Sequence, residues 1–326
     1  MKKNKLGRTN LEISEITLGG GWVGGLFIDA EYKVMENAIE LALDRGINWI
    51  DTAESYSEGV SEKNIGMLLD CLNPNEKIYV SSKARLDRQS SETFESQIDR
   101  KLDNSLKRLK LDQLNLYQLH NKITLEKGSE TLTEKEVLEA NGLAEIMLKL
   151  KEDQRVQNIG ITALGDTNSI KNVLETGYFD TAQVYYNLLN PSVEFEEADA
   201  WNDHDFSGLI SVCNKHKMGV LGIRVFAAGL LATDIRHGRE IPVTNVINID
   251  EEERRAHKLS ELVGENYGNR AQYALRYGLS SKHIHSIVIG MATLEHLKNS
   301  IEAVEMGPLP ASLLKDISEL QKSNFL

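Results

Sequence analysis

Short apolar strands alternate with amphipathic helices along almost the whole of this chain. An apolar run at 16–18 is followed by a glycine-rich loop and a helix over 31–45, and this order then recurs. The later strands are expected at 47–51, 78–83, 114–120, 157–162, 181–187, 219–225 and 285–290, and the later helices at 61–72, 91–109, 134–152, 167–176, 206–217, 269–279 and 294–304. Strands that alternate with helices form a parallel sheet through right-handed crossovers. Eight such units in 326 residues predict an α/β fold, a closed (β/α)8 TIM barrel.

The chain shows no composition break, linker or low-complexity segment, so a single domain over residues 1–326 is expected. A doubly wound sheet is the alternative architecture. Turn residues between short alternating flanks at 6–13 predict an N-terminal β-hairpin that caps part of the fold. The longest inserts all follow strands and lie at 121–133, 188–205 and 226–266, the last with a helical piece near 251–263. In a barrel they rise at the C-terminal face, where active sites are built.

The composition limits the expected partners and location. A formal net charge of -12 and a pI near 5.3 make the surface repel phosphates, so neither nucleic acid nor an anionic membrane is expected as a partner. No apolar run approaches the ~20 residues that span a bilayer, and no signal peptide is recognised, so a cytoplasmic protein is expected. Cys71 and Cys213 are interpreted as reduced packing residues. The histidines form no HExxH motif, so no metal site is expected.

Two motifs imitate sequence signatures of other dehydrogenase folds. The G-x-G-x-x-G pattern at 19–24 follows a strand, as the Rossmann fingerprint does. That fingerprint requires the helix to begin within the motif, whereas here residues 25–30 intervene, so a Rossmann fold is not favoured. Tyr79-x-x-x-Lys83 imitates the Tyr/Lys pair of short-chain dehydrogenases, which lies on a helix. Because this pair falls in a β-branched run, Tyr79 is interpreted as barrel packing.

Polar side chains follow three consecutive predicted strands at the point where each strand ends. Asp51 ends the first of them, and Tyr56 stands in the loop that follows it. Lys83 ends the second strand, and His120 ends the third. Because the carboxyl ends of parallel strands meet at one rim, these four side chains are expected to lie together.

The four residue types suit proton transfer to a substrate oxygen. A phenol is a weak acid at neutral pH, but an adjacent ammonium favours the phenolate, and Lys83 can supply that charge to Tyr56. Asp51 would pair with Lys83, and His120 would hydrogen-bond the substrate oxygen. Each residue alone also has a structural interpretation: Asp51 as a cap, Lys83 as a solvated cation and His120 as a rim histidine. Four suitable residues on three consecutive strands favour catalysis.

The sequence resembles the aldo-keto reductase superfamily over nearly its whole length. The matching segments are LGRT at 6–9, DTAESY at 51–56, SK at 82–83, LYQLH at 116–120, IGIT at 159–162 and QVYYN at 183–187. The resemblance implies a (β/α)8 barrel that binds a nicotinamide cofactor without a Rossmann domain. It also implies that Tyr56 is the general acid/base, that Asp51 and Lys83 tune it and that His120 orients the carbonyl, with hydride coming from the cofactor.

The resemblance further assigns contacts to the nicotinamide end of the cofactor. Thr162 and Gln183 are expected to hold the carboxamide, although Thr162 is followed by alanine where the family often has Ser-Asn. Ile223 and Arg224 stand where the family commonly has a stacking aromatic residue and a serine. Arg224 is expected either to reach the pyrophosphate or to pair with an acidic loop residue.

The segment 290–300 matches the part of the family that binds the adenosine end. Its candidate contacts are Gly290, His296, Lys298 and Ser300. His296 stands where an arginine often binds the 2′-phosphate, and Lys298 is expected to compensate. A neutral imidazole and the glycine at 290 argue against a strict requirement for NADP(H). The resemblance to the family alone favours NADP(H) as the cofactor, with NAD(H) as the alternative.

These implications predict an NAD(P)H-dependent oxidoreductase that interconverts an aldehyde or ketone and the corresponding alcohol. The alternatives are an aldose dehydrogenase that uses NAD and a slow, cofactor-sensing binding subunit of other proteins. Trp22 in the glycine-rich loop and Trp201 in the insert after the sixth strand are expected to line the pocket for a small carbonyl or sugar substrate. For Trp201, the alternative is that it anchors its own loop. The sequence indicates neither the substrate nor the oligomeric state.

Overall fold

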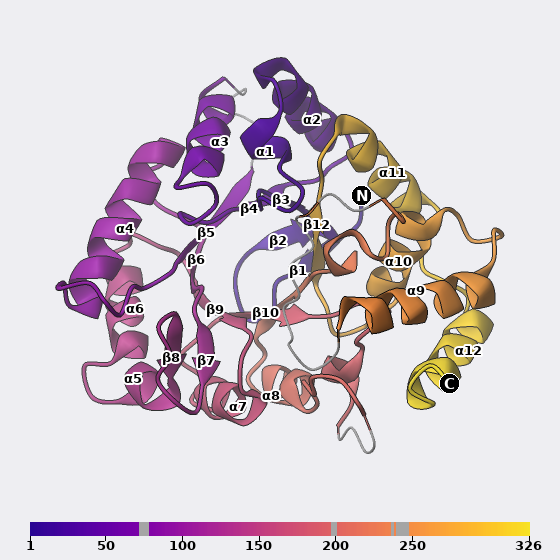
Figure 1. Ribbon diagram of the computed structural model, residues 1–326. Coiled ribbons are helices and arrows are strands. Elements are labelled where there is room, and N and C mark those ends of the chain that lie inside the picture. The colour runs from indigo at the N-terminus through magenta and orange to yellow at the C-terminus, as the bar shows by residue number, and fades with distance from the viewer. Residues whose placement is uncertain (72–77, 197–200, 236–237, 239–247) are drawn as a thin grey trace.

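Eight parallel strands form a closed barrel in the computed structural model, which describes residues 1–71, 78–196, 201–235, 238 and 248–326 (Figure 1). Their bounds are β3 Ile16–Gly19, β4 Trp49–Asp51, β5 Tyr79–Ala84, β6 Leu116–Leu119, β9 Ile159–Ala163, β10 Thr181–Tyr185, β11 Gly219–Ile223 and β12 Ser286–Gly290. The last strand closes the ring on the first, with Ile287 of β12 opposite Ile16 of β3. The predicted (β/α)8 barrel is thus confirmed, and the doubly wound alternative is excluded.

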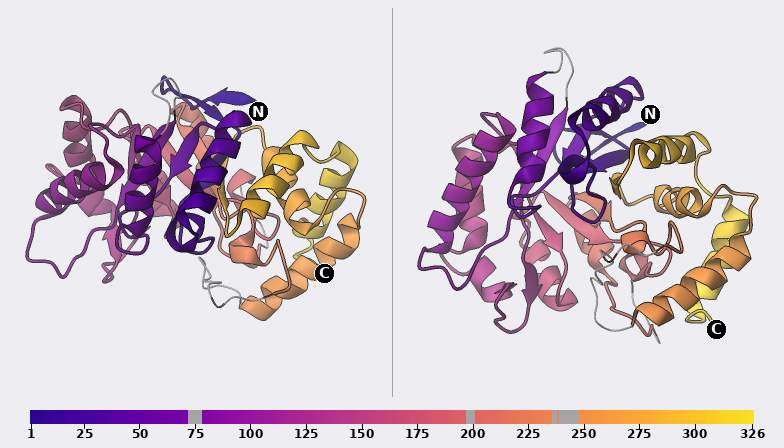
Figure 2. Two further views of the ribbon diagram at one scale, coloured as in Figure 1. Left: turned by 90° about the horizontal axis from the view of Figure 1, so that it is seen from above. Right: turned by 45° about the horizontal axis from the view of Figure 1, so that its top comes forward.

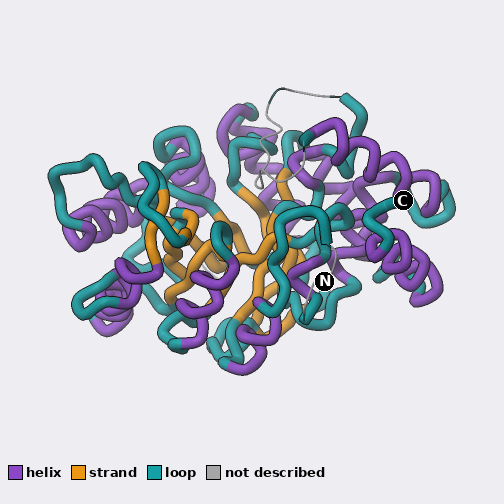
Figure 3. Tube along the Cα trace, turned by 60° about the horizontal axis from the view of Figure 1, so that its bottom comes forward, coloured by secondary structure: helices purple, strands orange, loops and turns teal. Residues whose placement is uncertain are grey.

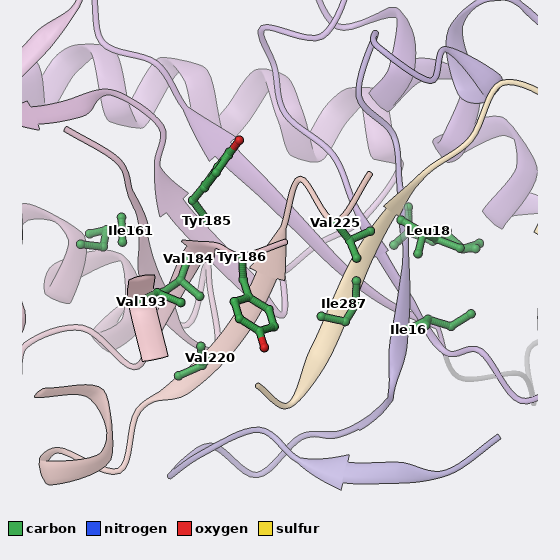
Figure 4. Packing of buried hydrophobic residues seen from close by; sticks show 14 of the residues in the cluster. Ile16, Leu18, Ile161, Val184, Tyr185, Tyr186, Val193, Val220, Val225 and Ile287 are labelled. Atoms are coloured by element: carbon green, nitrogen blue, oxygen red, sulfur yellow. The ribbon is translucent and has the colours of Figure 1, made fainter. Parts of the chain in front are cut away.

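Helices cover the outside of the barrel (Figures 1 and 3). Those that follow the strands along the chain are α2 Tyr32–Asp44, α3 Val60–Asp70, α4 Phe94–Leu109, α6 Leu143–Glu152, α7 Thr167–Glu175, α8 Leu209–Lys215, α10 Arg270–Leu279 and α11 Leu294–Glu305. Every second strand residue faces outward and packs beneath these helices, as Ile16, Ile161, Val184 and Ile287 do (Figure 4). This outer apolar layer fixes the strands whose inner faces carry the polar residues.

The helix predicted over 134–152 is in fact two helices, α5 Glu134–Leu138 and α6. Asn141 adopts a φ of 59°, and Gly142 is the N-cap of α6. A Cβ on Gly142 would lie 2.6 Å from the carbonyl oxygen of Glu139, so the turn leaves no room for a side chain there. The Asn-Gly pair therefore interrupts a pattern that is otherwise helical.

Several short elements and one long helix were not expected. They are α1 Leu26–Asp29, β7 Lys122–Thr124, β8 Thr131–Thr133, η1 Ser192–Glu194, η2 Ala227–Gly229 and α12 Ala311–Lys322. The helical piece predicted near 251–263 is confirmed as α9 Ile249–Val263, which packs against α12 beside the barrel. Residue 72 of the predicted helix 61–72 and parts of the predicted inserts 188–205 and 226–266 lie outside the described residues.

The predicted hairpin is formed by β1 Lys3–Lys5 and β2 Glu12–Ser14, which pair antiparallel at one end of the barrel (Figure 2, left). Leu6 and Leu11 from its turn are buried in a cluster with inward-facing strand residues. That cluster consists of Leu6, Leu11, Ile13, Trp49, Leu116 and Leu221, with Tyr79 and Val288 packed against it. Tyr79 is thus confirmed as barrel packing, and the hairpin closes the end of the barrel where the strands begin.

Neither a membrane span nor a metal cluster is seen in the described part of the chain. None of its helices is both long and apolar enough to cross a bilayer. No group of three or more His, Cys, Asp or Glu side chains there is arranged to hold a metal ion. Cys71 is exposed and Cys213 is buried, and both are free thiols.

Candidate active site

The interior of the barrel changes from apolar to polar along the strands. Trp49 lies two residues before Asp51 and Leu116 lies two residues before Gln118, so each pair shares the inward face of its strand. Trp49 and Leu116 belong to the cluster capped by the hairpin, whereas Asp51 and Gln118 are buried polar residues nearer the strand ends. The polar layer therefore lies at the carboxyl ends of the strands, where barrel enzymes place their sites.

The ammonium of Lys83 occupies the centre of this polar layer. Its Nζ donates to Asp51 Oδ2 at 2.6 Å, to the carbonyl oxygen of Thr52 at 2.8 Å and to Tyr56 Oη at 3.3 Å. The Lys83 side chain is 1% exposed and that of Asp51 is 4% exposed. Burial disfavours the charged ammonium, but attraction to Asp51 and Tyr56 outweighs it and raises the pKa of Lys83 above its usual value. A fixed positive charge thus lies against the phenol oxygen.

Asp51 is held by further donors on its other oxygen. Its Oδ1 accepts hydrogen bonds from Ser81 Oγ at 2.7 Å, from Gln183 Nε2 at 2.8 Å and from Gln118 Nε2 at 3.4 Å. Trp49 Nε1 donates to Ser81 Oγ at 3.0 Å. Because that hydroxyl already accepts a hydrogen bond from the indole, its own proton is directed at Asp51. One carboxylate oxygen is therefore fixed by neutral donors, while the other faces Lys83.

Ser81 and Gln118 were not identified from the sequence, although strand alternation contained the signal. Ser81 lies two residues before Lys83, and Gln118 lies two residues before His120. Residues spaced by two share a face of a strand, so both polar side chains had to enter the barrel beside the predicted site.

His120 lies across the tyrosine ring from this network. The ring centroids of His120 and Tyr56 are 5.6 Å apart and the rings meet edge to face at 82°. Ser55 Oγ lies 3.3 Å from His120 Nδ1. Burial, followed by the positive charge of Lys83, lowers the pKa of His120 well below its usual value. The imidazole is therefore neutral at pH 7 and offers one N–H donor and one acceptor nitrogen.

The four predicted side chains are thus gathered at the rim of the barrel formed by β4, β5 and β6. The model of the Aldo/keto reductase family matches residues 15–322. The chain belongs to the aldo/keto reductase family. It is accordingly an oxidoreductase of a family whose members generally use a nicotinamide dinucleotide and carbonyl substrates.

Curated relatives of this aldo/keto reductase are distant. Aldo-keto reductase YhdN of Bacillus subtilis (strain 168) is 28% identical over 199 residues, which cover 60% of this chain and 56% of that protein. L-galactose dehydrogenase of Arabidopsis thaliana is 25% identical over 92% of this chain and 86% of its own length. NADH-specific methylglyoxal reductase of Escherichia coli (strain K12) is 24% identical over 98% of this chain and 99% of its own length.

A solved structure of the family supports the same fold. The holo form of aldo-keto reductase AKR11C1 from Bacillus halodurans superposes with a TM-score of 0.73, covering 98% of this chain and 96% of that chain. The sequence identity is 22%, so this likeness concerns the fold.

The residues expected at the nicotinamide end of the cofactor face one another across two strands. Thr162 of β9 is opposite Gln183 of β10, and both are buried. Within the described residues, the buried Thr162 Oγ1 has no hydrogen-bond partner. Gln183 uses its Nε2 on Asp51. The unpaired hydroxyl fits a bound amide, which would supply the missing partner, so these residues suit a nicotinamide carboxamide.

Two further predicted cofactor residues lie where β11 ends, and a third ends β12. Ile223 is half-buried, and Arg224 adopts a φ of 64°, with its carbonyl oxygen accepting a hydrogen bond from Asn187 Nδ2 at 3.1 Å. The Arg224 charge also contributes to the low pKa of His120, after burial, Lys83 and Arg85. Gly290 is exposed, with open space where a side chain would stand. All three residues therefore belong to the rim of the barrel.

The remaining predicted cofactor contacts lie on α11, and they differ in whether their side chains are accessible to a ligand. The imidazole of exposed His296 accepts a hydrogen bond from the amide of Ala292 at 3.2 Å. Lys298 is exposed and its Nζ lies 3.3 Å from Glu295 Oε2. Ser300 is 5% exposed and its hydroxyl donates to the carbonyl oxygen of His296 at 2.9 Å. His296 and Lys298 thus face solvent, whereas Ser300 is engaged within the helix.

The loop that carries Trp22 covers the tyrosine of the site. A Cβ on Gly21 would lie 3.7 Å from Cζ of Tyr56, so the backbone of this loop runs over the phenol ring. Trp22, the next residue, is 36% exposed. This position keeps Trp22 as a candidate wall of the pocket.

Trp201 is part of an aromatic cluster that joins its insert to the C-terminus. Its ring meets Phe195 at a centroid distance of 6.1 Å and Phe325 at 6.5 Å. The guanidinium of buried Arg255 lies 5.8 Å from the same ring. These contacts agree with the alternative interpretation, in which Trp201 anchors its own loop.

Proposed function

We propose that this oxidoreductase interconverts an aldehyde or ketone and the corresponding alcohol, with a nicotinamide dinucleotide as the redox partner. The observation that carries the proposal is the buried Lys83 ammonium, which contacts Asp51 and Tyr56 together beside a neutral His120. Burial of a charged lysine lowers the stability of the fold unless a counter-charge and hydrogen bonds compensate it. Here the compensating partners include Tyr56, the proposed proton donor.

In the reductive direction, Tyr56 donates its phenolic proton to the carbonyl oxygen. The Lys83 charge, 3.3 Å from Tyr56 Oη, stabilises the phenolate that is left behind. Asp51 keeps the ammonium oriented, and neutral His120 donates a hydrogen bond that positions the same carbonyl oxygen. In the oxidative direction, the Tyr56 phenolate takes the proton from the alcohol.

Thr162, Gln183, Ile223 and Arg224 would hold the nicotinamide and pyrophosphate groups of the dinucleotide. When bound, it supplies or accepts the hydride. Gly290, the exposed imidazole of His296 and the exposed ammonium of Lys298 would meet the adenosine end, and the resemblance to the family favours NADP(H). Glu295, which pairs with Lys298, supports NAD(H) as the alternative.

Oxidation of a sugar with NAD is the second candidate. Support for it comes from the similarity to L-galactose dehydrogenase over 92% of this chain. A panel of aldehydes, ketones and sugars, assayed with both cofactors in both directions, separates the two candidates. Steady turnover in that panel would also distinguish an enzyme from a slow cofactor-sensing subunit.

The decisive variant is Tyr56→Phe. It should bind the dinucleotide normally and lower the single-turnover rate by ~10²-fold or more, because it removes the proton donor and little volume. Tyr178→Phe, at an exposed tyrosine before β10, is the matched control and should keep the native rate. A Tyr56→Phe protein that reduces a good aldehyde at close to the native rate would refute the assigned role.

A further inference from the structure

We infer that Arg85 binds a carboxylate on the substrate, so that the preferred substrates are oxo acids, carbonyl compounds with an anionic end. This inference rests on the proposed carbonyl chemistry. It concerns a residue outside the tetrad, the four residues Asp51, Tyr56, Lys83 and His120.

Arg85 stands directly above the lysine of the tetrad. Ser81 and Lys83 of β5 both hydrogen-bond Asp51 inside the barrel, so odd-numbered residues of this strand face inward. The alternation of the strand therefore directs Arg85, the first residue after β5, toward the mouth of the barrel.

The backbone on both sides of Arg85 is fixed to the catalytic loops. The Arg85 amide donates to Glu54 Oε1 at 3.0 Å, and Glu54 lies two residues before Tyr56. The carbonyl oxygen of the preceding residue, Ala84, accepts a hydrogen bond from the His120 amide at 2.8 Å. Arg85 is thus held between the loops of the proton donor and of the orienting histidine.

The Arg85 charge is available for a ligand. Its guanidinium is exposed and makes no hydrogen bond or ion pair with any described residue. Glu54 does not neutralise it, since its Oε1 accepts from the Lys101 ammonium at 2.8 Å and from the Arg85 amide. Arg88 shows the contrast, because both of its terminal nitrogens donate to Glu136 at 2.6 Å.

The charge of Arg85 also reaches the site. After burial and Lys83, Arg85 is the next contributor to the low pKa of His120, ahead of Arg224. A carboxylate that binds Arg85 would therefore place its substrate beside the imidazole that orients the carbonyl.

The position of β5 in the ring of strands indicates that the carboxylate bound by Arg85 belongs to the substrate and not to the dinucleotide. The residues proposed to hold the dinucleotide lie on or at the ends of β9, β10, β11 and β12, which are consecutive neighbours, or on α11, the helix that follows β12. β5 lies between β4 and β6, on the other half of the ring, and is four strands away from β11 in either direction. Arg224, at the end of β11, is thus the cation on the dinucleotide side, and Arg85 is the cation on the opposite side.

The test compares two aldehydes that differ in the anionic end, succinic semialdehyde and its methyl ester. The ratio of their kcat/KM values should favour the acid in the native enzyme. Arg85→Gln should lower that ratio by ~10- to 100-fold, as expected for loss of a charge-assisted hydrogen bond. Arg85→Lys should restore part of the ratio, because it keeps the charge without the bidentate fork.

Two controls separate binding at Arg85 from a general charge effect. Arg100→Gln removes an exposed arginine that pairs with Glu92 on the outer helix α4, and it should leave the ratio at the native value. Salt at ~1 M should lower the native ratio more than that of Arg85→Gln, since it screens an exposed cation.

The outcomes distinguish this inference from the proposed function. Equal kcat/KM for the acid and the ester in the native enzyme would refute the inference and leave the carbonyl chemistry standing. A native preference for the acid that persists in Arg85→Gln would show that another residue binds the carboxylate. If no carbonyl compound of the panel is turned over, the proposed function fails, and this inference fails with it.

Discussion

Replacing each member of the Lys83–Asp51 pair, singly and together, should separate its contribution to stability from its contribution to catalysis. Lys83→Met leaves a carboxylate that is 4% exposed without its ammonium, and Asp51→Asn leaves an ammonium that is 1% exposed without its carboxylate. In Asp51→Asn, the retained amide oxygen can still accept the hydrogen bonds of Ser81 and Gln183. The change therefore removes the charge while preserving most of the surrounding network.

The expected magnitude follows from breaking a buried ion pair. Each single variant should lower the free energy of unfolding by about 3–5 kcal/mol, since one buried charge is left uncompensated. An unfolding entropy of about 2.1 cal/mol/K per residue over 326 residues converts this loss to a decrease in Tm of roughly 4–7 °C. The double variant buries no unpaired charge, so it should lose much less than the sum of the two single losses.

Urea unfolding at pH 7, followed by circular dichroism, measures the loss of unfolding free energy in the two single variants and in the double variant. Single-turnover reduction of one aldehyde measures the rate in the same proteins. The double variant should recover stability and remain as slow as Lys83→Met, because Tyr56 still lacks the adjacent charge. Lys149→Met, which removes an exposed ammonium that pairs with Glu95 between the outer helices α6 and α4, is the matched lysine control.

Strict additivity of the two single losses, within about 0.5 kcal/mol, would show that Lys83 and Asp51 do not act as a pair. Recovery of the native rate in the double variant would show that Tyr56 does not depend on the Lys83 charge.

Four further predictions follow from other features. Ser81→Ala should slow reduction by ~10-fold with little change in KM for the dinucleotide, because Asp51 loses its closest neutral donor; unchanged kinetics would remove Ser81 from the positioning network. Burial, followed by the charge of Asp203, raises the pKa of Glu252 to about 7 from 4.5, so the native state binds the extra proton and stability falls as pH rises from 4.5 to 7. Glu252→Gln should abolish this loss, of at most about 3 kcal/mol, in urea unfolding at pH 5 and pH 8; the reverse slope would contradict the assignment. If His296 contacts the 2′-phosphate, the ratio of kcat/KM for NADPH over NADH should be larger at pH 6 than at pH 8, and His296→Arg should strengthen and flatten it. Trp22→Ala should raise KM across the aldehyde panel, and an unchanged KM throughout would exclude Trp22 from the pocket.

The local sequence pattern was sufficient to predict the barrel fold and the proximity of the four tetrad residues. Apolar runs of strand length and periodic helices recur with short connections, and parallel strands bring their carboxyl ends to one rim. Asp51, Lys83 and His120 stand at those ends, so their proximity followed from strand order alone, and Tyr56 is close because its loop is short.

The features that escaped prediction depend on contacts between distant segments. Trp201 packs on Phe325, at the far end of the chain, and no local pattern indicates that partner. The helical sequence pattern over 134–152 continues through residues 139–142, where extended Glu139 and the turn at Asn141 and Gly142 separate α5 from α6. Ser81 and Gln118 appear as ordinary polar strand residues until the structure shows that both donate hydrogen bonds to Asp51 Oδ1.

Closure of the barrel between β3 and β12 determines when each strand of the nascent chain can find its partner. β3 begins at residue 16 and pairs along its length with β12, which ends at residue 290. The N-terminal hairpin contacts the same end of the chain, because Asn4 Nδ2 donates to the carbonyl oxygen of His285 at 2.8 Å. On the ribosome, β3 emerges early and can pair with β4 at once, but its other edge has no partner until most of the polypeptide has been synthesised. An unpaired strand edge is a template for association with other chains. The nascent chain therefore exposes this edge of β3 until β12 has been synthesised.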